Sequence, residues 1–409
     1  MEVFVVFAAL SALGLAAYSL QLLAVRSFGQ ASSVKKRDEA ATFPSSSAFL
    51  PPVSILKPLK GLDDNLFDNL ESFCKLDYPE YEVIFSLQNY NDPAYKVVKK
   101  IRDNYPDRDI SIHVEHCNAG LNPKVNNLIP AYRTSKYPLI LISDSNVLVD
   151  KNYLREIVQE MRDPEVGLVS NLIRGMGGYS FGAVLENLHM NSFVMGSVCF
   201  LDRFLKMPCV IGKSMLMRKR DLEAIGGLNS VKNVLAEDYL IGKRIHDMGK
   251  KVVVSGHMIN NVNNYWSIKK FFNRHTRWGK LRWHIGGAKY FSELLGNPVF
   301  MAFLPILIDG PSQWNLLLAG LVSSYKMAGD SLIGRRIGTD LKASSYLLSP
   351  VKDLLIGIMW FVPLLSTTVV WRGNRYIIGK DSLLSPCLLR PSHSVPILGG
   401  QIPPNRYQF

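Results

Sequence analysis

Cysteine is scarce in this sequence, and its spacing excludes two kinds of site. The 409 residues include five cysteines, an odd number, and no two of them stand in the C-x-x-C spacing typical of zinc sites and redox motifs. We therefore expect reduced thiols, with neither a structural zinc site nor a disulfide framework. The cysteines are Cys74, Cys117, Cys199, Cys209 and Cys387.

Acidic residues are also few beside the basic ones. There are 34 Asp and Glu against 47 Lys and Arg, which gives a formal net charge of +13. Net charge without a recognition motif is a weak sign of nucleic-acid binding, and the chain carries long hydrophobic segments. Basic charge beside a membrane meets anionic lipid headgroups, and here it can also meet a diphosphate. The composition therefore predicts a membrane partner and no nucleic acid.

Val3 to Val25 is the first long hydrophobic segment. A helix of this length can cross a hydrocarbon core of about 30 Å. Glu2 stands where a signal peptide has basic residues, and no small-residue cleavage site follows, so we expect a retained anchor. The alternative is a buried helix of a soluble domain. By the positive-inside rule, the far side is cytoplasmic because it carries Arg26, Lys35, Lys36 and Arg37.

Short apolar runs alternate with helical patterns from Val53 onward. This alternation is typical of an α/β fold with a mostly parallel sheet flanked by helices. The expected elements are strands at Val53–Leu56, Val83–Leu87, Ile110–Val114 and Leu139–Ile142, and helices at Leu62–Phe73 and after Pro93. Ligands bind beyond the carboxyl ends of the strands in such sheets. Lys57, Asn89 to Asp92 and Asp144 fall together at that edge.

Asp144-Ser145-Asn146 follows the last of these strands as a short acidic turn. Its oxygens suit a hard cation, so we expect Mg²⁺ or Mn²⁺ held by Asp144 and, more weakly, by Asn146. Such a cation would bridge phosphate oxygens and stabilise a departing diphosphate. The alternative is an ordinary solvated turn.

Two other polar positions suit a nucleotide. Asp92 precedes Pro93, and it either caps the following helix or contacts a nucleoside or the metal shell. Lys124, within Asn122–Asn127, stands before a helix, where an anion is favoured.

Glu237-Asp238 opens the helical run Tyr239 to Met248. Carboxylates in a first turn are favoured by the helix dipole, and one placed there can also take a proton from an acceptor hydroxyl as a general base. Adjacent carboxylates point in different directions, so only one of the two can face the reacting carbon.

Trp266 to Trp283 mixes aromatic and basic residues and predicts an amphipathic helix, which lies either at the bilayer interface or against the sheet. Arg274 and Arg277 share one face of it, where guanidinium groups can clamp a diphosphate, and Trp278 can shield the site or touch lipid. The alternative is solvated charge on a surface helix.

A turn of small residues precedes the apolar end of Val210–Leu216. Its residues Gly212, Lys213 and Ser214 are expected to border the acceptor pocket.

Two hydrophobic segments follow near the C-terminus. Val299 to Tyr325 is interrupted by Asp309-Gly310-Pro311, which marks either a kinked span or a re-entrant hairpin. Leu354 to Trp371 is a cleaner span with Pro363 inside it. Each arrangement leaves some basic residues on the unfavoured side, so the topology stays open.

Six short motifs together closely resemble the ceramide glucosyltransferase family, in order and approximate spacing from Val53 to Trp278. The motifs are Ser54–Gly61, Asn122-Pro123-Lys124, Asp144-Ser145, Gly212–Met215, Ala236–Tyr239 and Arg274-x-x-Arg277-Trp278. The stretch Trp371–Tyr376 is also like the family, so the resemblance covers most of the chain. One departure lies between Leu185 and Gly196, where animal members carry Ser-His-Pro and this chain has His189 in Asn187-Leu188-His189-Met190-Asn191.

The resemblance implies a GT-A fold, a UDP-sugar donor and an inverting displacement at the anomeric carbon. Asp92, Asp144 and Asp238 would be the aspartates of a D, D, D, (Q/R)-x-x-R-W pattern, with Asp238 as the base. Arg274, Arg277 and Trp278 would complete that catalytic pattern. The residues expected to bind the nucleotide sugar are Pro58, Lys60, Asp92, Lys124 and Asp144.

We therefore expect metal-dependent transfer of glucose from UDP-glucose to the primary hydroxyl of ceramide by an integral membrane enzyme. The active site would face the cytosol, from a Golgi or ER membrane in a eukaryote or the inner membrane in a bacterium. Alternatives are another lipid acceptor (diacylglycerol, a sterol or a hopanoid), another UDP-sugar, a polysaccharide synthase, and a catalytically silent membrane protein that binds nucleotide sugar. The expected parts are an anchor (1–26), a linker (27–50), a cytosolic GT-A domain (51–262), an interfacial helix (263–290), C-terminal membrane segments (291–372) and a tail (373–409).

Overall fold

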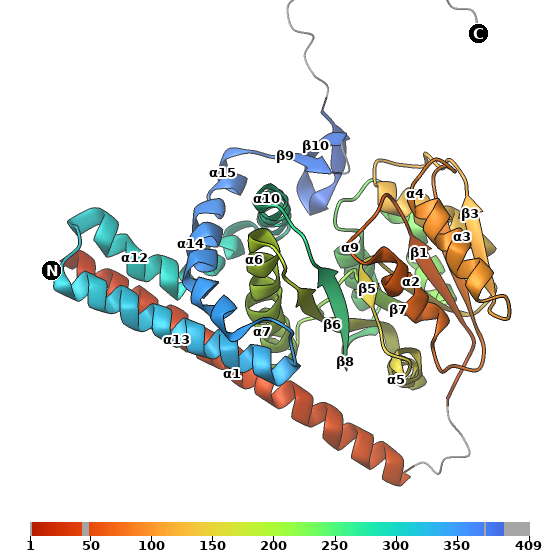
Figure 1. Cartoon of the computed structure of the whole chain (residues 1–409), viewed down its shortest axis with the longest axis horizontal. Coiled ribbons are helices and arrows are strands. Elements are labelled where there is room, and N and C mark those ends of the chain that lie inside the picture. The colour runs from red at the N-terminus through yellow and green to blue at the C-terminus, as the bar shows by residue number, and fades with distance from the viewer. Residues whose placement is uncertain (1, 43–48, 372–373, 388–409) are drawn as a thin grey trace, which may run out of the picture.

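The computed structural model describes residues 2–42, 49–371 and 374–387, with an eight-stranded sheet on one side and a group of long helices on the other (Figure 1). The strand order is β3-β2-β1-β4-β7-β6-β8-β5. The pairs β3–β2, β2–β1, β1–β4 and β6–β8 are parallel, whereas β7 and β5 pair antiparallel with their neighbours. The strands are β1 Val53–Pro58, β2 Tyr81–Leu87, β3 Ile110–Val114, β4 Leu139–Ser143, β5 Val147–Leu148, β6 Val166–Gly177, β7 Ser214–Arg218 and β8 Lys251–Asn263.

The predicted α/β fold, with a mostly parallel sheet between helices, is confirmed, and each of the four predicted strands is present. These strands are nearly continuous apolar runs because both faces of a parallel sheet are covered. Ile55 and Val83 point into the core on one face, and Leu56 and Ile84 point into the core on the other. The first face is covered by α2 Leu66–Cys74, α3 Ala94–Asn104 and α5 Tyr153–Gln159, and the second by α4 Pro123–Thr134, α8 Lys219–Ala224 and α9 Glu237–Asp247.

The N-terminal helix is longer than the anchor that the sequence predicts. Helix α1 runs from Glu2 to Thr42, so the first part of the expected linker is helical. The physical reason is composition, because the polar stretch after Val25 is rich in Ala, Lys and Arg, which favour helix. The rest of the expected linker lies partly outside the described residues.

By length and composition, two described helices can cross a membrane: Glu2–Phe28 and Ala343–Leu365. A third span is possible if Ile268–Leu295 and Pro298–Asp309, which meet at a bend of 68°, count as one. The predicted span Leu354 to Trp371 extends too far, because its last residues, Thr368–Trp371, form strand β9.

The break at Asp309-Gly310-Pro311 separates two packed helices. Gly310 has a φ of +87°, a conformation that favours glycine, and the chain turns there from α12 into α13. Val299 and Ala302 of α12 pack against Val322 of α13, and α13 lies along α1 (Figure 1). The remaining helices are η2 Glu160–Arg162, α6 Phe181–His189, η3 Met190–Val194, α7 Met195–Phe200, η4 Leu201–Leu205, η5 Leu228–Val231, α10 Ile268–Gly286, η6 Gly287–Tyr290, α11 Phe291–Leu295, α12 Pro298–Asp309, α13 Gln313–Ile337, η7 Ala343–Leu348, α14 Ser349–Met359, α15 Val362–Leu365 and η8 Lys380–Ser382.

A small second sheet, which was not predicted from the sequence, follows α15. Its strands β9 Thr368–Trp371, β10 Asn374–Ile378 and β11 Leu384–Pro386 pair antiparallel. Val369 and Tyr376 pack against Leu235, next to the start of α9. Part of the predicted tail is therefore folded against Leu235, beside α9, and residues 388–409 lie outside the described residues.

Charged side chains are buried between the long helices. Asp330 of α13 accepts hydrogen bonds from Tyr18 Oη at 2.6 Å and Lys326 Nζ at 2.5 Å. Lys352 Nζ lies 3.5 Å from the other Asp330 oxygen and 2.8 Å from Asp353 Oδ1. Two lysines and two aspartates, all of them buried, thus balance each other, and an unpaired charge there would be costly.

Asp330→Ala is expected to destabilise the protein by about 3 to 5 kcal/mol, because it leaves Lys326 and Lys352 buried with too little compensating charge. The thermal midpoint in detergent, followed by tryptophan fluorescence, measures this. Asp309→Ala, at an exposed helix end, is the matched control and should unfold like the wild type. Equal midpoints for the two variants would show that the cluster does not stabilise the helix packing.

Candidate functional site

A large cleft lies beyond the carboxyl ends of β1 and β4. It has an empty volume of about 2250 Å³ and is lined by the ends of these strands, α4, α9, α10 and β9. Most of the residues singled out in the sequence face it: Pro58, Lys60, Lys124, Asp144, Asn146, Gly212, Lys213, Asp238, Arg274, Arg277 and Trp278. Segments far apart in the chain therefore meet where a parallel sheet normally binds its ligand.

Asp144 is held between two lysines. Its Oδ1 lies 2.9 Å from Lys124 Nζ and its Oδ2 lies 2.9 Å from Lys213 Nζ. Lys213 Nζ also donates to Asn146 Oδ1 at 2.7 Å. Burial opposes the charge of Asp144, but the two ammonium groups outweigh burial and keep the pKa of this carboxyl well below its usual range. The site thus brings together an ionised carboxylate and two cations.

A buried lysine fixes the backbone of Asp144 through a hydrogen bond. Lys57 Nζ donates to the Asp144 carbonyl at 2.7 Å and to Ser143 Oγ at 3.2 Å. The same ammonium lies 3.7 Å from the centre of the Phe73 ring, a favourable cation–π geometry. Burial lowers the pKa of Lys57. Lys57 therefore supports the turn that carries Asp144.

The two carboxylates at the start of α9 take different partners. Glu237 is buried. It accepts a hydrogen bond from Asn122 Nδ2 at 3.1 Å and lies 2.9 Å from Lys124 Nζ. Asp238 instead accepts the Gly212 N–H at 2.9 Å and the Tyr239 N–H at 2.8 Å. Burial and the neighbouring Glu237 charge raise the pKa of Asp238 to about 6. Asp238 is therefore the carboxylate whose basicity suits proton transfer near neutral pH.

The turn before β7 is shaped by its glycine. A Cβ atom on Gly212 would clash with the Asp238 carboxylate, so only glycine lets this backbone approach so closely. The Gly212 carbonyl accepts from Lys124 Nζ at 3.1 Å. Ser214, predicted beside the acceptor, is fully buried and donates to Asn171 Oδ1 at 2.7 Å, so its side chain is turned away from the cleft.

Arg274 is enclosed by two indole rings and a buried glutamate. Its guanidinium carbon lies 4.2 Å from the centre of the Trp278 ring and 5.1 Å from that of Trp266. Its Nη1 lies 3.0 Å from Glu186 Oε1, and the other Glu186 oxygen lies 2.9 Å from His275 Nε2. Glu186 was not predicted; the available signal was one carboxylate in the otherwise apolar start of α6.

Helix α10 is amphipathic, as predicted, but protein covers part of its apolar side. Phe271 is fully buried against Leu185 of α6 and Met359 of α14. Arg277 lies 6.0 Å from the Trp371 ring of β9. The small second sheet therefore closes the cleft on the side of the arginines.

Asp92 does not line the cleft. Its two oxygens accept the Gly61 N–H at 2.9 and 3.0 Å, and Oδ1 also accepts the Ala94 N–H at 2.9 Å. It thus caps α3, one of its two predicted roles, and it also holds the loop after β1, in which Lys60 lies.

Asp144 and Asn146 were expected to hold a divalent cation. Among the residues described, no three His, Cys, Asp or Glu side chains cluster so as to hold a metal ion. Mg²⁺ and Mn²⁺ commonly use one or two protein oxygens and complete their shell with substrate phosphates. The two side chains fit a cation that binds together with a diphosphate, once Lys213 gives up its contacts with both of them and Lys124 gives up its contact with Asp144.

Comparison with known proteins gives one family. The model of glycosyl transferase family 21 matches residues 5–384. Ceramide glucosyltransferase 3 of Caenorhabditis elegans is 30% identical over 352 residues, which cover 82% of this chain and 75% of that protein. Ceramide glucosyltransferase 1 of the same organism is 30% identical over 346 residues, with 80% and 72% covered.

Among solved structures, the mannosyltransferase PcManGT from Pyrobaculum calidifontis, in complex with GDP-Man and Mn²⁺, is 17% identical with a TM-score of 0.46. The match covers 86% of this chain and 99% of that one.

Proposed function

The chain belongs to glycosyl transferase family 21, and we propose that it moves glucose from UDP-glucose to the primary hydroxyl of ceramide. The observation that carries this proposal is the meeting of a basic carboxylate, Asp238, with a group of cations at one cleft. A transferase for a nucleotide sugar needs both, because it must deprotonate the acceptor and neutralise the departing diphosphate.

The diphosphate would lie on the cationic side of the cleft. Lys124 and Lys213 approach from the sheet side, and Arg274 and Arg277 from α10. A guanidinium group can bind a phosphate through two parallel hydrogen bonds, whereas an ammonium group acts as a point charge. We assign Pro58, Lys60 and Asp92 to the nucleotide side; Asp92 would act there through the Gly61 loop.

Asp238 would act as the base. The acceptor oxygen attacks the anomeric carbon from the face opposite the UDP, the bond from that carbon to the UDP oxygen breaks, and the configuration inverts. The acceptor proton passes to the Asp238 carboxylate, and UDP leaves with the electron pair of the broken bond. Gly212 fixes Asp238 through its N–H, and Gly212 and Lys213 would border the acceptor.

Asp144 and Asn146 would hold the divalent cation, which when bound would add positive charge beside the leaving group. The catalytic domain would lie at the cytosolic face of the membrane, following the basic residues after the first span.

The same cleft would also serve another lipid hydroxyl or another UDP-sugar, and a silent nucleotide-sugar binder would keep the cations without turnover. Purified protein in nanodiscs, offered UDP-glucose, UDP-galactose or UDP-N-acetylglucosamine with ceramide, diacylglycerol or a sterol, separates these cases. We expect glucosylceramide as the main product. Asp238→Asn should retain UDP binding and lose about 10²- to 10⁴-fold in rate, whereas Asp247→Asn, at the exposed end of α9, should match the wild type. UDP binding without any product would favour the silent binder.

The rate should depend on the protonation of Asp238. Because a base must be ionised, kcat/KM for the acceptor should be high above pH 6 and fall as pH drops through about 6, the pKa of this carboxyl. Glu237→Gln removes a like charge that raises this pKa, so the acid limb should move to lower pH. An acid limb at the same pH in that variant would assign it to another group.

Removal of the metal tests the role of Asp144 and Asn146. EDTA should lower the rate by more than about tenfold, and added Mg²⁺ or Mn²⁺ should restore it. Asn146→Ala should raise the metal concentration needed for half-maximal rate. Full activity in EDTA would show that Lys124 and Lys213 suffice to neutralise the diphosphate.

A further inference from the structure

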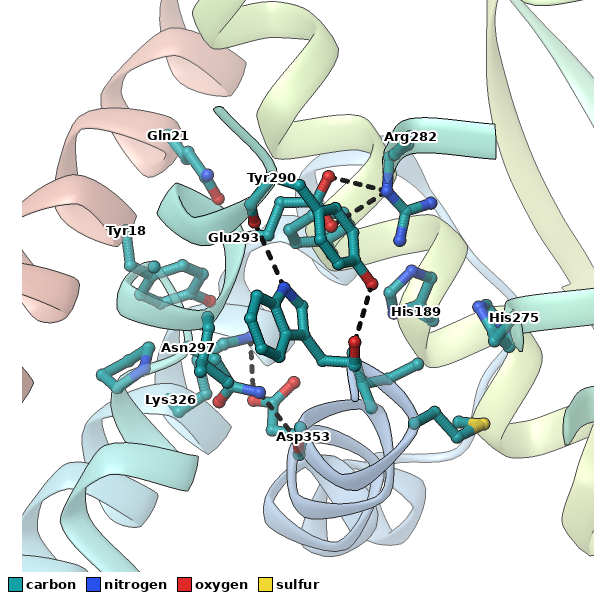
Figure 2. A pocket seen from close by; sticks show the side chains of 18 residues that line it. Tyr18, Gln21, His189, His275, Arg282, Tyr290, Glu293, Asn297, Lys326 and Asp353 are labelled. Carbon is teal, nitrogen blue, oxygen red and sulfur yellow. Dashed lines mark hydrogen bonds and ion pairs between the residues drawn. The ribbon is translucent and has the colours of Figure 1, made fainter. Parts of the chain in front are cut away.

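A second, inner cavity lies beside the cleft, among the long helices (Figure 2). It is narrow, and the space of about 710 Å³ between its walls includes a part that is open to solvent. Its walls include α1 and α14, which belong to the two helices apolar enough to cross a membrane. Phe193 and Arg282 line both the inner cavity and the cleft, so the two spaces share a boundary. A lipid in the inner cavity would therefore point one end toward the sugar donor.

His189 lines this cavity with two unsatisfied ring nitrogens. The side chain is 2% exposed, and within the described part of the chain neither nitrogen has a hydrogen-bond partner. Figure 2 shows the ring beside His275 and Arg282, with no dashed line reaching it. Burial, and then the charge of His275, lower the pKa of His189, so the ring is neutral near pH 7. Buried polar atoms normally find partners, and here the open space beside the ring is the place for one.

The ring is also held in a defined position. It stacks on Phe193, with centroids 5.0 Å apart, and meets His275 edge-on at 4.4 Å. Phe193 belongs to η3, a π-helical turn that begins directly after His189. Such turns are rare and are frequent at functional sites. An irregular helical turn thus lies at the boundary between the two cavities.

We propose that the inner cavity holds the amide end of the ceramide acceptor and that His189 binds it, an inference that rests on the proposed function. A neutral imidazole offers one N–H donor and one nitrogen acceptor, so it is satisfied by a ligand that supplies an acceptor and a donor. Ceramide supplies both, through its amide and the neighbouring hydroxyl. Diacylglycerol offers only ester oxygens beside its reacting hydroxyl, and these cannot donate. His189 therefore selects the amide lipid.

Part of the cavity wall suits the apolar part of such a lipid, beside charged residues such as Glu293 and Lys326. Tyr290 and Trp360 stack face to face, with ring centroids 5.0 Å apart and planes 6° apart. The two residues also form hydrogen bonds with each other. Tyr290 Oη donates to the Trp360 carbonyl, and Trp360 Nε1 donates to the Tyr290 carbonyl, both at 3.2 Å. The paired rings thus offer apolar surface to the hydrocarbon chains.

The first test compares ceramide with N-methylceramide, which lacks the amide donor. The wild type should show a KM about tenfold lower for ceramide. In His189→Phe the KM for ceramide should rise about tenfold and the two lipids should become equal, while the KM for UDP-glucose stays unchanged. His189→Gln keeps a donor and an acceptor and should retain part of the preference. His284→Phe, a histidine of α10 that lines neither cavity, is the matched control. Wild-type discrimination in His189→Phe would overturn the proposal.

The second test needs no turnover and no variant. A ceramide with a diazirine in its acyl chain is photolysed with the wild-type protein in nanodiscs, and the labelled peptides are mapped. Labelling within residues 185–194 or 353–360 supports the inner cavity, and labelling confined to the outer faces of α1 and α13 overturns it. Labelling of the cavity without sugar transfer would instead overturn the proposed function and leave the lipid site standing.

Discussion

The geometry of the cleft depends on the contacts that the Lys124 ammonium makes. It lies 2.9 Å from Asp144 and 2.9 Å from Glu237, and it donates to the Gly212 carbonyl at 3.1 Å. These partners come from the end of β4, the start of α9 and the turn before β7. With Asp238 nearby, they would otherwise place three carboxylates close together, and of these only Asp144 would keep a cationic partner, Lys213. Burial opposes the charge of Lys124, but Asp144 and Glu237 outweigh it and raise its pKa, so the ammonium persists and holds the three elements together.

A buried carboxylate plays a similar part between the two cavities. Glu186 holds Arg274, which faces the cleft, and His275, which faces the inner cavity. Its pKa is lowered mainly by Arg274 and His275, against the effect of burial. Since Glu186 orients Arg274 in the cleft and His275 in the inner cavity, a displacement of α6 would disturb both spaces together. This coupling suits a reaction in which a soluble donor and a membrane lipid must be aligned at one carbon.

Much of this arrangement was accessible from the sequence, because it follows from local patterns. The strands before Lys57 and Asp144 are apolar runs with a clear end, and the residues after them must gather at one edge of a parallel sheet. Glu186 and the second sheet were not accessible in this way. The partners of Glu186 lie 88 and 89 residues further along the chain, and β9 to β11 are too short to show a period. Ser214 was misjudged because the side chains of a strand alternate, and its own points to Asn171 while its neighbour Lys213 faces the cleft.

The apolar helices need polar contacts to define their positions, because lipid tails are as apolar as leucine and the hydrophobic effect does not choose between helix packings in a bilayer. The cluster around Asp330 supplies such contacts between α1, α13 and α14. It also reaches the boundary of the two cavities, since Lys352 Nζ donates to Ser192 Oγ at 3.0 Å, within the π-helical turn after His189. The buried charges of the helices are therefore connected, through one lysine, to the π-helical turn at the boundary of the two cavities. If the inner cavity holds the acceptor as proposed, the position of the lipid relative to Asp238 would be set by electrostatic pairing among the helices as much as by the shape of the cleft.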